Sequence, residues 1–172
     1  MGQVDITPEF LGELGECCFK QYSTLNGWAW TSTEKIYKKP IHNNRLEFAF
    51  GFERILVQIP YEIQKEIHEI SKPSNRNVAS PSFVYDYLAC KAYDSDDPRL
   101  LDGMKVDDFR WVEVKTGNSQ LSNNQIKKLN VITLPLVVFR VPNILDPPKD
   151  WKVVLKEGNS DFWLQDSQQN SD

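Results

Sequence analysis

Three charged residues lie in segments that otherwise have the composition of buried strands. Asp86 lies within SFVYDYLACKA, and Glu113 and Lys115 lie within FRWVEVK, separated by one residue. Because side chains alternate across a strand, Glu113 and Lys115 project from the same face. A buried carboxylate is costly unless it is paired with a cation or bound to a metal ion. These residues therefore predict either a cation site or a buried ion pair.

A cation site would have a recognisable chemistry. Two carboxylates on neighbouring strands offer the oxygen ligands that hard divalent cations prefer. Lys115 would then hold or deprotonate a water beside the metal, or steady the charge on a phosphate. The alternative is a Lys–carboxylate pair that contributes only to structure. The E-x-K pattern does not decide between them, because alternating charge is also common on solvent-facing strands.

The segment that follows Lys115 favours the catalytic interpretation. Residues 109–125, FRWVEVKTGNSQLSNNQ, resemble the PD-(D/E)xK nuclease superfamily, and most closely its archaeal-type resolvases and virus-type replication-repair nuclease domains. In that family a strand ending in EVK is followed by a short loop, a Leu-Ser pair and a helix with Gln in its first turn. Leu121, Ser122 and Gln125 match these positions.

The resemblance extends more loosely over residues 9–30 and 82–141. The family has an Asp at the head of an earlier strand, which matches Asp86, although the Pro that precedes it in the family is absent here. Family members also carry a Glu in their first helix. Glu16 fits that position best, and Glu13 is the alternative.

The resemblance implies a fold and a metal site. The fold would be α/β and restriction-endonuclease-like: a mixed β-sheet flanked by helices, with an αβββαβ core. Asp86 and Glu113 would hold Mg²⁺, the carbonyl of Val114 would be a further ligand, and Glu16 would bind a second metal or a bridging water. Mn²⁺ would substitute for Mg²⁺.

The resemblance also implies an activity. Lys115 would orient the attacking water, and Gln125 would hold either the lysine or the phosphate. We therefore expect a metal-dependent nuclease that hydrolyses DNA phosphodiester bonds, of the structure-specific or repair and recombination type. The alternative is a catalytically silent binding or assembly module on the same fold. The acidic pI of about 5.3 and the acidic loop over residues 94–108 would suit such a module.

The order of local patterns predicts the elements that position these residues. Thr7-Pro8 has the form of a helix start, and apolar residues then recur at helical spacing as far as Leu25. Ser122 has the form of the N-cap of a second such helix. The full prediction is helices over residues 8–25, 61–70 and 123–133, and strands from residue 28 and over 46–50, 55–59, 82–92, 109–115, 136–141 and 151–156.

The chain is long enough for one domain with a substantial core. It has 172 residues, of which 40% are hydrophobic and 12% aromatic. We expect a single nuclease-like domain over residues 1–158 and a disordered tail over 159–172. Within the domain, residues 31–80 match no family feature and form a substrate-side insertion, and residues 94–108 form an acidic surface loop.

The charge distribution permits a nucleic-acid partner without requiring one. The net charge is −4, but residues 34–76 carry eight Lys and Arg against six Asp and Glu. We expect DNA as the partner, with phosphate contacts drawn from Lys35, Lys38, Lys39, Arg45 and Ser122. The other interpretation of these basic residues is an ordinary solvated face.

Composition also bears on location. No apolar run approaches the ~20 residues needed to cross a bilayer, and the N-terminal segment lacks the features of a signal peptide. The odd count of three cysteines, two of them adjacent, suits neither a disulfide framework nor a zinc site. We expect a cytoplasmic protein with no membrane partner; a homodimer is left open.

Overall fold

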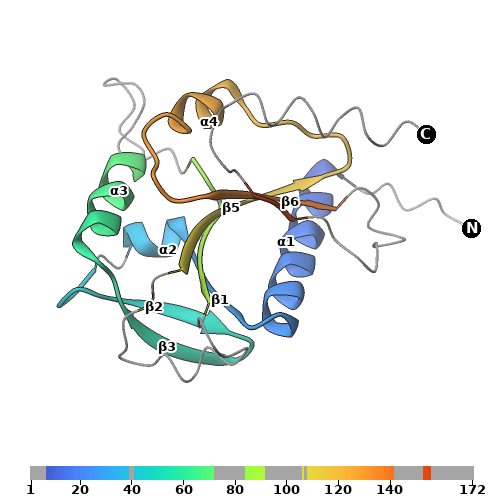
Figure 1. Cartoon of the computed structure of the whole chain (residues 1–172). Helices are drawn as coiled ribbons and strands as arrows, with labels where there is room; N and C mark the ends of the chain where they lie inside the picture. Colours follow the sequence, from blue (N-terminus) through green and yellow to red (C-terminus); the bar gives the residue numbers. More distant parts are fainter. Residues whose placement is uncertain are drawn as a thin grey trace, which may run out of the picture.

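The computed structural model describes residues 7–38, 41–71, 84–91, 106, 108–141 and 153–155. Its centre is a seven-stranded sheet of order β3-β2-β1-β4-β5-β6-β7 (Figure 1). Neighbouring strands are antiparallel except β5 and β6, which are parallel. The strands are β1 Trp28–Ser32, β2 Arg45–Phe50, β3 Glu53–Gln58, β4 Tyr87–Lys91, β5 Asp108–Thr116, β6 Leu136–Val141 and β7 Val153–Leu155.

Helices cover both faces of this sheet, which confirms the predicted mixed α/β class. The helices are α1 Pro8–Leu25, α2 Thr33–Lys38, α3 Tyr61–Ser71 and α4 Asn123–Lys128. Helix α1 lies on one side of the central strands, and α2 and α3 lie on the other (Figure 1). As predicted, α1 begins after Thr7, whose hydroxyl accepts a hydrogen bond from the Phe10 N–H at 3.2 Å.

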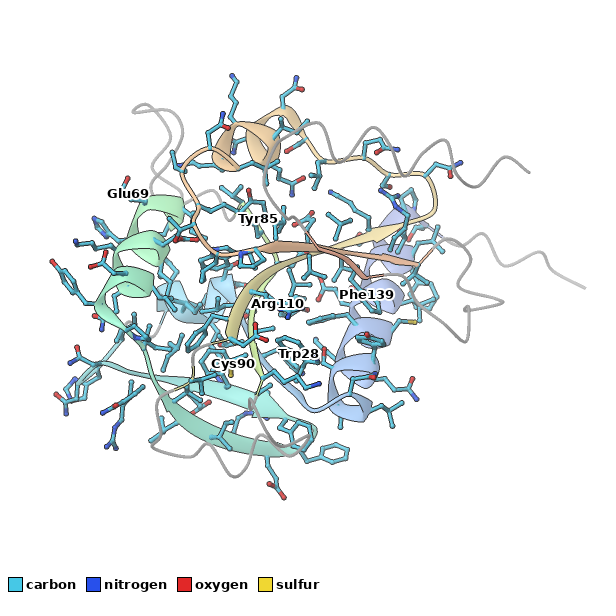
Figure 2. All side chains as sticks on the ribbon, in the orientation of Figure 1. Trp28, Glu69, Tyr85, Cys90, Arg110 and Phe139 are labelled. Atoms are coloured by element: carbon cyan, nitrogen blue, oxygen red, sulfur yellow. The ribbon has the colours of Figure 1, made fainter. Side chains whose placement is uncertain are left out.

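Alternate residues of the central strands build two separate core layers. Tyr87, Val112 and Phe139 pack with Phe19 of α1. The intervening residues of the same strands pack in the other layer with the apolar face of α3. In Figure 2, Phe139 and Trp28 lie on the α1 side, whereas Tyr85 lies beneath α4. Because both faces are covered, the central strands are apolar on both parities, as the sequence indicates.

The structure differs from the local predictions in three places. It contains helix α2, which the sequence analysis does not predict. The predicted strand over 82–92 begins only at Tyr87, and residues 84–86 form an irregular segment, so Asp86 lies at the head of β4 rather than within it. The predicted helix over 123–133 ends at Lys128: the N–H groups of residues 129–131 bond to carbonyls three residues earlier, and those of Thr133 and Leu134 bond to the Glu66 carboxylate.

The predicted insertion corresponds to a distinct part of the architecture. Elements α2, β2, β3 and α3 stand between β1 and β4 in the sequence and extend the sheet beyond β1. Without them, the order up to β6 is α1, β1, β4, β5, α4, β6. The acidic loop, apart from residues 106 and 108, and the tail over 159–172 lie outside the described residues. None of the helices in the described ranges is long and apolar enough to cross a membrane.

Candidate functional site

Asp86 is fixed by β5 on one side and by the start of α2 on the other. Its N–H donates to the Val112 carbonyl at 3.0 Å, and its carbonyl accepts from the Thr33 N–H at 3.0 Å. Its carboxylate oxygen Oδ2 accepts from the Val114 N–H at 2.8 Å. Val114 separates Glu113 from Lys115, so these contacts bring the carboxylate of Asp86 to the E-x-K segment of β5.

Glu113 is a buried carboxylate with only one of its oxygens engaged. The residue is 4% exposed, and its Oε1 accepts from the Lys115 ammonium at 2.8 Å. Its Oε2 is also buried and has no hydrogen-bond partner in the described part of the chain. A buried acceptor without a donor costs about 1–3 kcal/mol. One oxygen of this carboxylate is therefore left without a hydrogen bond from the described residues.

The surroundings of Asp86 make its negative charge unfavourable. Burial, followed by the charge of Glu113, raises its pKa from the ordinary 3.8 to about 7. The Val114 N–H and the Lys115 ammonium oppose this rise, while Glu16 adds to it. Two neighbouring carboxylates with one ammonium are thus short of positive charge, and a divalent cation would supply it.

Glu16 reaches this site through Tyr87. Its Oε2 accepts from the Tyr87 hydroxyl at 2.5 Å, and Tyr87 directly follows Asp86. Burial and this hydrogen bond raise the pKa of the Tyr87 phenol, which keeps it a donor. Glu13, the alternative to Glu16, is exposed. Gly15 allows the approach of α1, because a Cβ there would lie 2.5 Å from Cγ2 of Thr116.

Gln125 and Ser122 contact main chain rather than Lys115. The Gln125 amide accepts from the Ser122 N–H at 2.9 Å and donates to the Val84 carbonyl at 2.9 Å. The Ser122 hydroxyl accepts from the Gln125 N–H at 3.2 Å and completes the capping box. In this arrangement Gln125 fastens the segment before Asp86 to α4, and the Tyr85 hydroxyl adds a bond to the Gln125 carbonyl at 3.0 Å.

The predicted basic contacts that the structure describes lie on α2 and at the start of β2, and both of the described lysines pair with an acid. Lys38 pairs with Glu34 one turn earlier on α2. Lys35 pairs with Glu47 of β2. Arg45 is exposed at the start of β2. Lys39 lies outside the described residues.

Several positioning residues escaped sequence reasoning. Thr33 holds the Asp86 carbonyl, and Tyr87 holds Glu16. Arg140, paired in register with Lys115, donates to the carbonyls of Gly117 at 3.1 Å and Ser119 at 2.7 Å. It therefore holds the loop that follows the lysine. The available signal was an arginine inside the otherwise apolar strand LVVFRV.

The donor set suits a cation that keeps much of its water. Among the described residues, no three His, Cys, Asp or Glu side chains form a ready-made group of ligands. Mg²⁺ is commonly held by one or two carboxylates, with waters and substrate phosphates completing its shell. Asp86 and Glu113 would supply the carboxylates of such a site, with the unpartnered oxygen of Glu113 as one donor.

No protein-family model, curated protein or solved structure matches this chain.

Proposed function

We propose that the chain is a metal-dependent nuclease that hydrolyses DNA phosphodiester bonds at Asp86, Glu113 and Lys115. The observation that supports this most strongly is the buried, unpartnered Oε2 of Glu113. The residue that follows Glu113 is Val114, and its N–H donates to the carboxylate of Asp86. A structural ion pair would be expected to satisfy both carboxylate oxygens, because an unpaired buried acceptor is costly.

The order of elements supports a restriction-endonuclease-like fold. Elements α1, β1, β4, β5, α4 and β6 follow one another as αβββαβ once residues 33–71 are set aside. The segment that resembles the PD-(D/E)xK superfamily, residues 109–125, corresponds to β5, a loop and the capped start of α4. Pattern and element order thus favour the same family.

The residues present fit a magnesium site. Asp86 and Glu113 would hold the ion, with the Val114 carbonyl as a further ligand, and Mn²⁺ would substitute. The ion would lower the pKa of a bound water and neutralise charge on the phosphate.

The chain's own groups would orient the reactants. If Glu113 were bound to a cation, Lys115 would no longer be held by the ion pair with Glu113. It would then donate to the attacking water or to a phosphate oxygen. Glu16, held by Tyr87, would position a water or a second ion. Gln125 would act indirectly, by fixing the segment that carries Asp86. The activity that we propose is that of a repair or recombination-type endonuclease. Its partner would be DNA, and its location the cytoplasm.

A silent binding or assembly module is the second candidate. The contacts that favour it are the 2.8 Å pair between Lys115 and Glu113 and the engagement of the Gln125 amide with main chain. In both contacts the side chains that would act on water or phosphate are bound to other groups of the protein.

A cleavage assay separates the two candidates. Labelled linear, flapped, Y-shaped and four-way DNA substrates are incubated with the wild type in Mg²⁺, Mn²⁺ or EDTA. The nuclease proposal expects cleavage that needs metal, is lost in Lys115→Ala and is kept in Lys65→Ala, a matched loss of an exposed lysine on α3. Binding without cleavage of any substrate in either metal would identify the silent module.

A further inference from the structure

A cavity of about 530 Å³ with a mixed polar and apolar lining lies within the inserted part of the sheet. Its wall combines the end of β1 and the start of α2 with the turn that precedes β2 and with residues of β2 and β3. Thr31, Lys35, Asn43, Arg45 and Gln58 contribute polar groups to it. The volume falls within the range of about 300–1,000 Å³ that is typical of sites for small ligands.

Sheet register brings this cavity to the same edge as the proposed catalytic residues. Strand β1, which carries Thr31, pairs directly with β4, and the Thr33 N–H bonds to the Asp86 carbonyl. Strand β2 follows β1 on the far side from β4. Since adjacent strands lie about 4.8 Å apart, the β2 wall is roughly 10 Å from β4. Neighbouring nucleotides of one strand could span that distance.

The wall carries a hydroxyl and a cation that a ligand could contact. Thr31 is 2% exposed, and its hydroxyl has no hydrogen-bond partner among the residues the structure describes. Arg45 is exposed, and within the described ranges the acid on the same wall, Glu47, pairs with Lys35 and Arg54. A buried hydroxyl and an exposed cation on one cavity suit a ligand with a polar, uncharged part and an anionic part. Lys35 adds a second cation, shared with Glu47.

We propose that this cavity binds an unpaired nucleotide of the DNA strand next to the bond that is cleaved. The base would lie inside, with its polar edge on the Thr31 hydroxyl, and its phosphate would contact Arg45 and Lys35. A base held in a duplex cannot enter such a cavity without being extruded. The inference rests on the proposed nuclease function and names its substrate class: DNA with a single-stranded segment, such as a flap or fork.

Binding measurements test this without relying on cleavage. The full-length Lys115→Ala protein is titrated with a labelled flapped duplex and with a fully paired duplex of equal length, in Ca²⁺ at fixed ionic strength. We expect at least about tenfold tighter binding of the flap. Adding Thr31→Val, which removes the hydroxyl but keeps the shape, or Arg45→Ala should reduce flap affinity about 5–20-fold and change duplex affinity less than twofold. Lys65→Ala is the control for charge.

An abasic nucleotide in the flap provides an independent check. It should weaken binding by a factor similar to Thr31→Val, and the two changes together should cost little more than either alone, because they remove the same contact. Equal flap and duplex affinities, or variants that weaken both equally, would overturn the proposal. So would competition by a free deoxynucleoside monophosphate that matches the oligonucleotide in affinity, since the cavity would then serve a free nucleotide.

The outcomes also separate this inference from the proposed function. Metal-dependent cleavage by the wild type together with unchanged flap binding by Thr31→Val would support the nuclease function and refute nucleotide binding in the cavity. A flap preference that depends on Thr31 and Arg45, with no cleavage in Mg²⁺ or Mn²⁺, would support nucleotide binding in the cavity and refute the nuclease function.

Discussion

Glu66 and Glu113 are buried to nearly the same extent, 5% and 4% exposed, but their surroundings differ. The Glu66 carboxylate accepts from the Trp111 indole N–H at 2.7 Å and from the main-chain N–H groups of Thr133 at 2.8 Å and Leu134 at 3.1 Å. The Thr133 hydroxyl also donates to it. Among the residues that the structure describes, Glu113 has a single partner, the Lys115 ammonium, on one oxygen.

The difference separates a carboxylate with a structural role from the one to which we assign a ligand in the proposed function. Glu66 ties α3 to β5 and to the segment that leads into β6, and all its partners belong to the fold. Glu113 lies two residues after Trp111, on the same face of β5 by strand alternation. The two carboxylates thus meet neighbouring positions on one face of β5 and differ in their number of hydrogen-bond partners among the described residues, which burial alone does not show.

The largest expected effect is on cleavage. Glu113→Gln should reduce the rate by on the order of 10³-fold, because it removes charge needed to hold the metal and to stabilise the transition state. Glu66→Gln should stay within about threefold per folded molecule. Initial rates in Mg²⁺, normalised to the folded fraction from near-ultraviolet circular dichroism, test this contrast. Retention of a tenth or more of wild-type activity by Glu113→Gln would place the chemistry elsewhere.

For the free energy of unfolding, we expect Glu66→Gln to have the larger effect of the two variants. Glu66→Gln should lower the free energy of unfolding by about 2–4 kcal/mol, since an amide cannot accept from all the donors that meet the carboxylate. Glu113→Gln in metal-free protein should change it by less than about 1 kcal/mol or raise it, because the loss of the ion pair with Lys115 is offset by the end of the repulsion between Glu113 and Asp86. Urea unfolding in EDTA measures both. A larger loss for Glu113→Gln would mean that this carboxylate is structural.

The sequence predicted the elements whose signals are local. Thr7-Pro8 marked the start of α1, and the spacing of Glu113 and Lys115 placed both on one face of β5. The Ser122 N-cap was also predicted, and the capping box with Gln125 bears it out. Each of these features depends on residues a few positions apart, where propensity and periodicity carry information.

The contacts that sequence could not predict join distant segments. Glu66 and Thr133 are 67 positions apart, so the helical pattern over 61–70 gave no sign that one acid on it is buried. The same holds for the Thr33 hydroxyl, which bonds to the Tyr85 carbonyl across 52 positions and helps to fix the segment before β4. The resemblance at residues 109–125 identified residue types, whereas the partners of each residue came only with the fold.

A smaller effect concerns pH. The folded pKa of Asp86, about 7, lies above the ordinary value, so the unfolded state releases this proton first. Metal-free stability should therefore fall as pH rises from about 4 to about 7, by on the order of 1–3 kcal/mol relative to Asp86→Asn. Urea unfolding in EDTA at pH 5, 6, 7 and 8 tests this.

Two further variants sharpen the pH comparison. Glu113→Gln should reduce the fall in stability, because the charge of Glu113 is one cause of the raised pKa. Glu66→Gln should leave the slope as in the wild type. Parallel curves for wild type and Asp86→Asn between pH 5 and pH 8 would contradict the raised pKa.

The smallest expected effect comes from two glycines of α1, and it tests how closely this helix must approach the site. A Cβ on Gly12 would meet nothing within 4 Å, whereas one on Gly15 would lie 2.5 Å from Cγ2 of Thr116 and 3.3 Å from Cγ1 of Val114. Gly12→Ala should stabilise the protein by about 0.5–1 kcal/mol, as expected inside a helix. Gly15→Ala should instead cost about 1 kcal/mol net, because the crowding outweighs the same helical gain. It should also move Glu16 away from the Tyr87 hydroxyl and slow cleavage several-fold, while the Trp111 indole N–H resonance, a reporter of Glu66, stays unchanged. If Gly15→Ala stabilises the protein as much as Gly12→Ala and cleaves at the wild-type rate, close packing of α1 on β5 does not position Glu16.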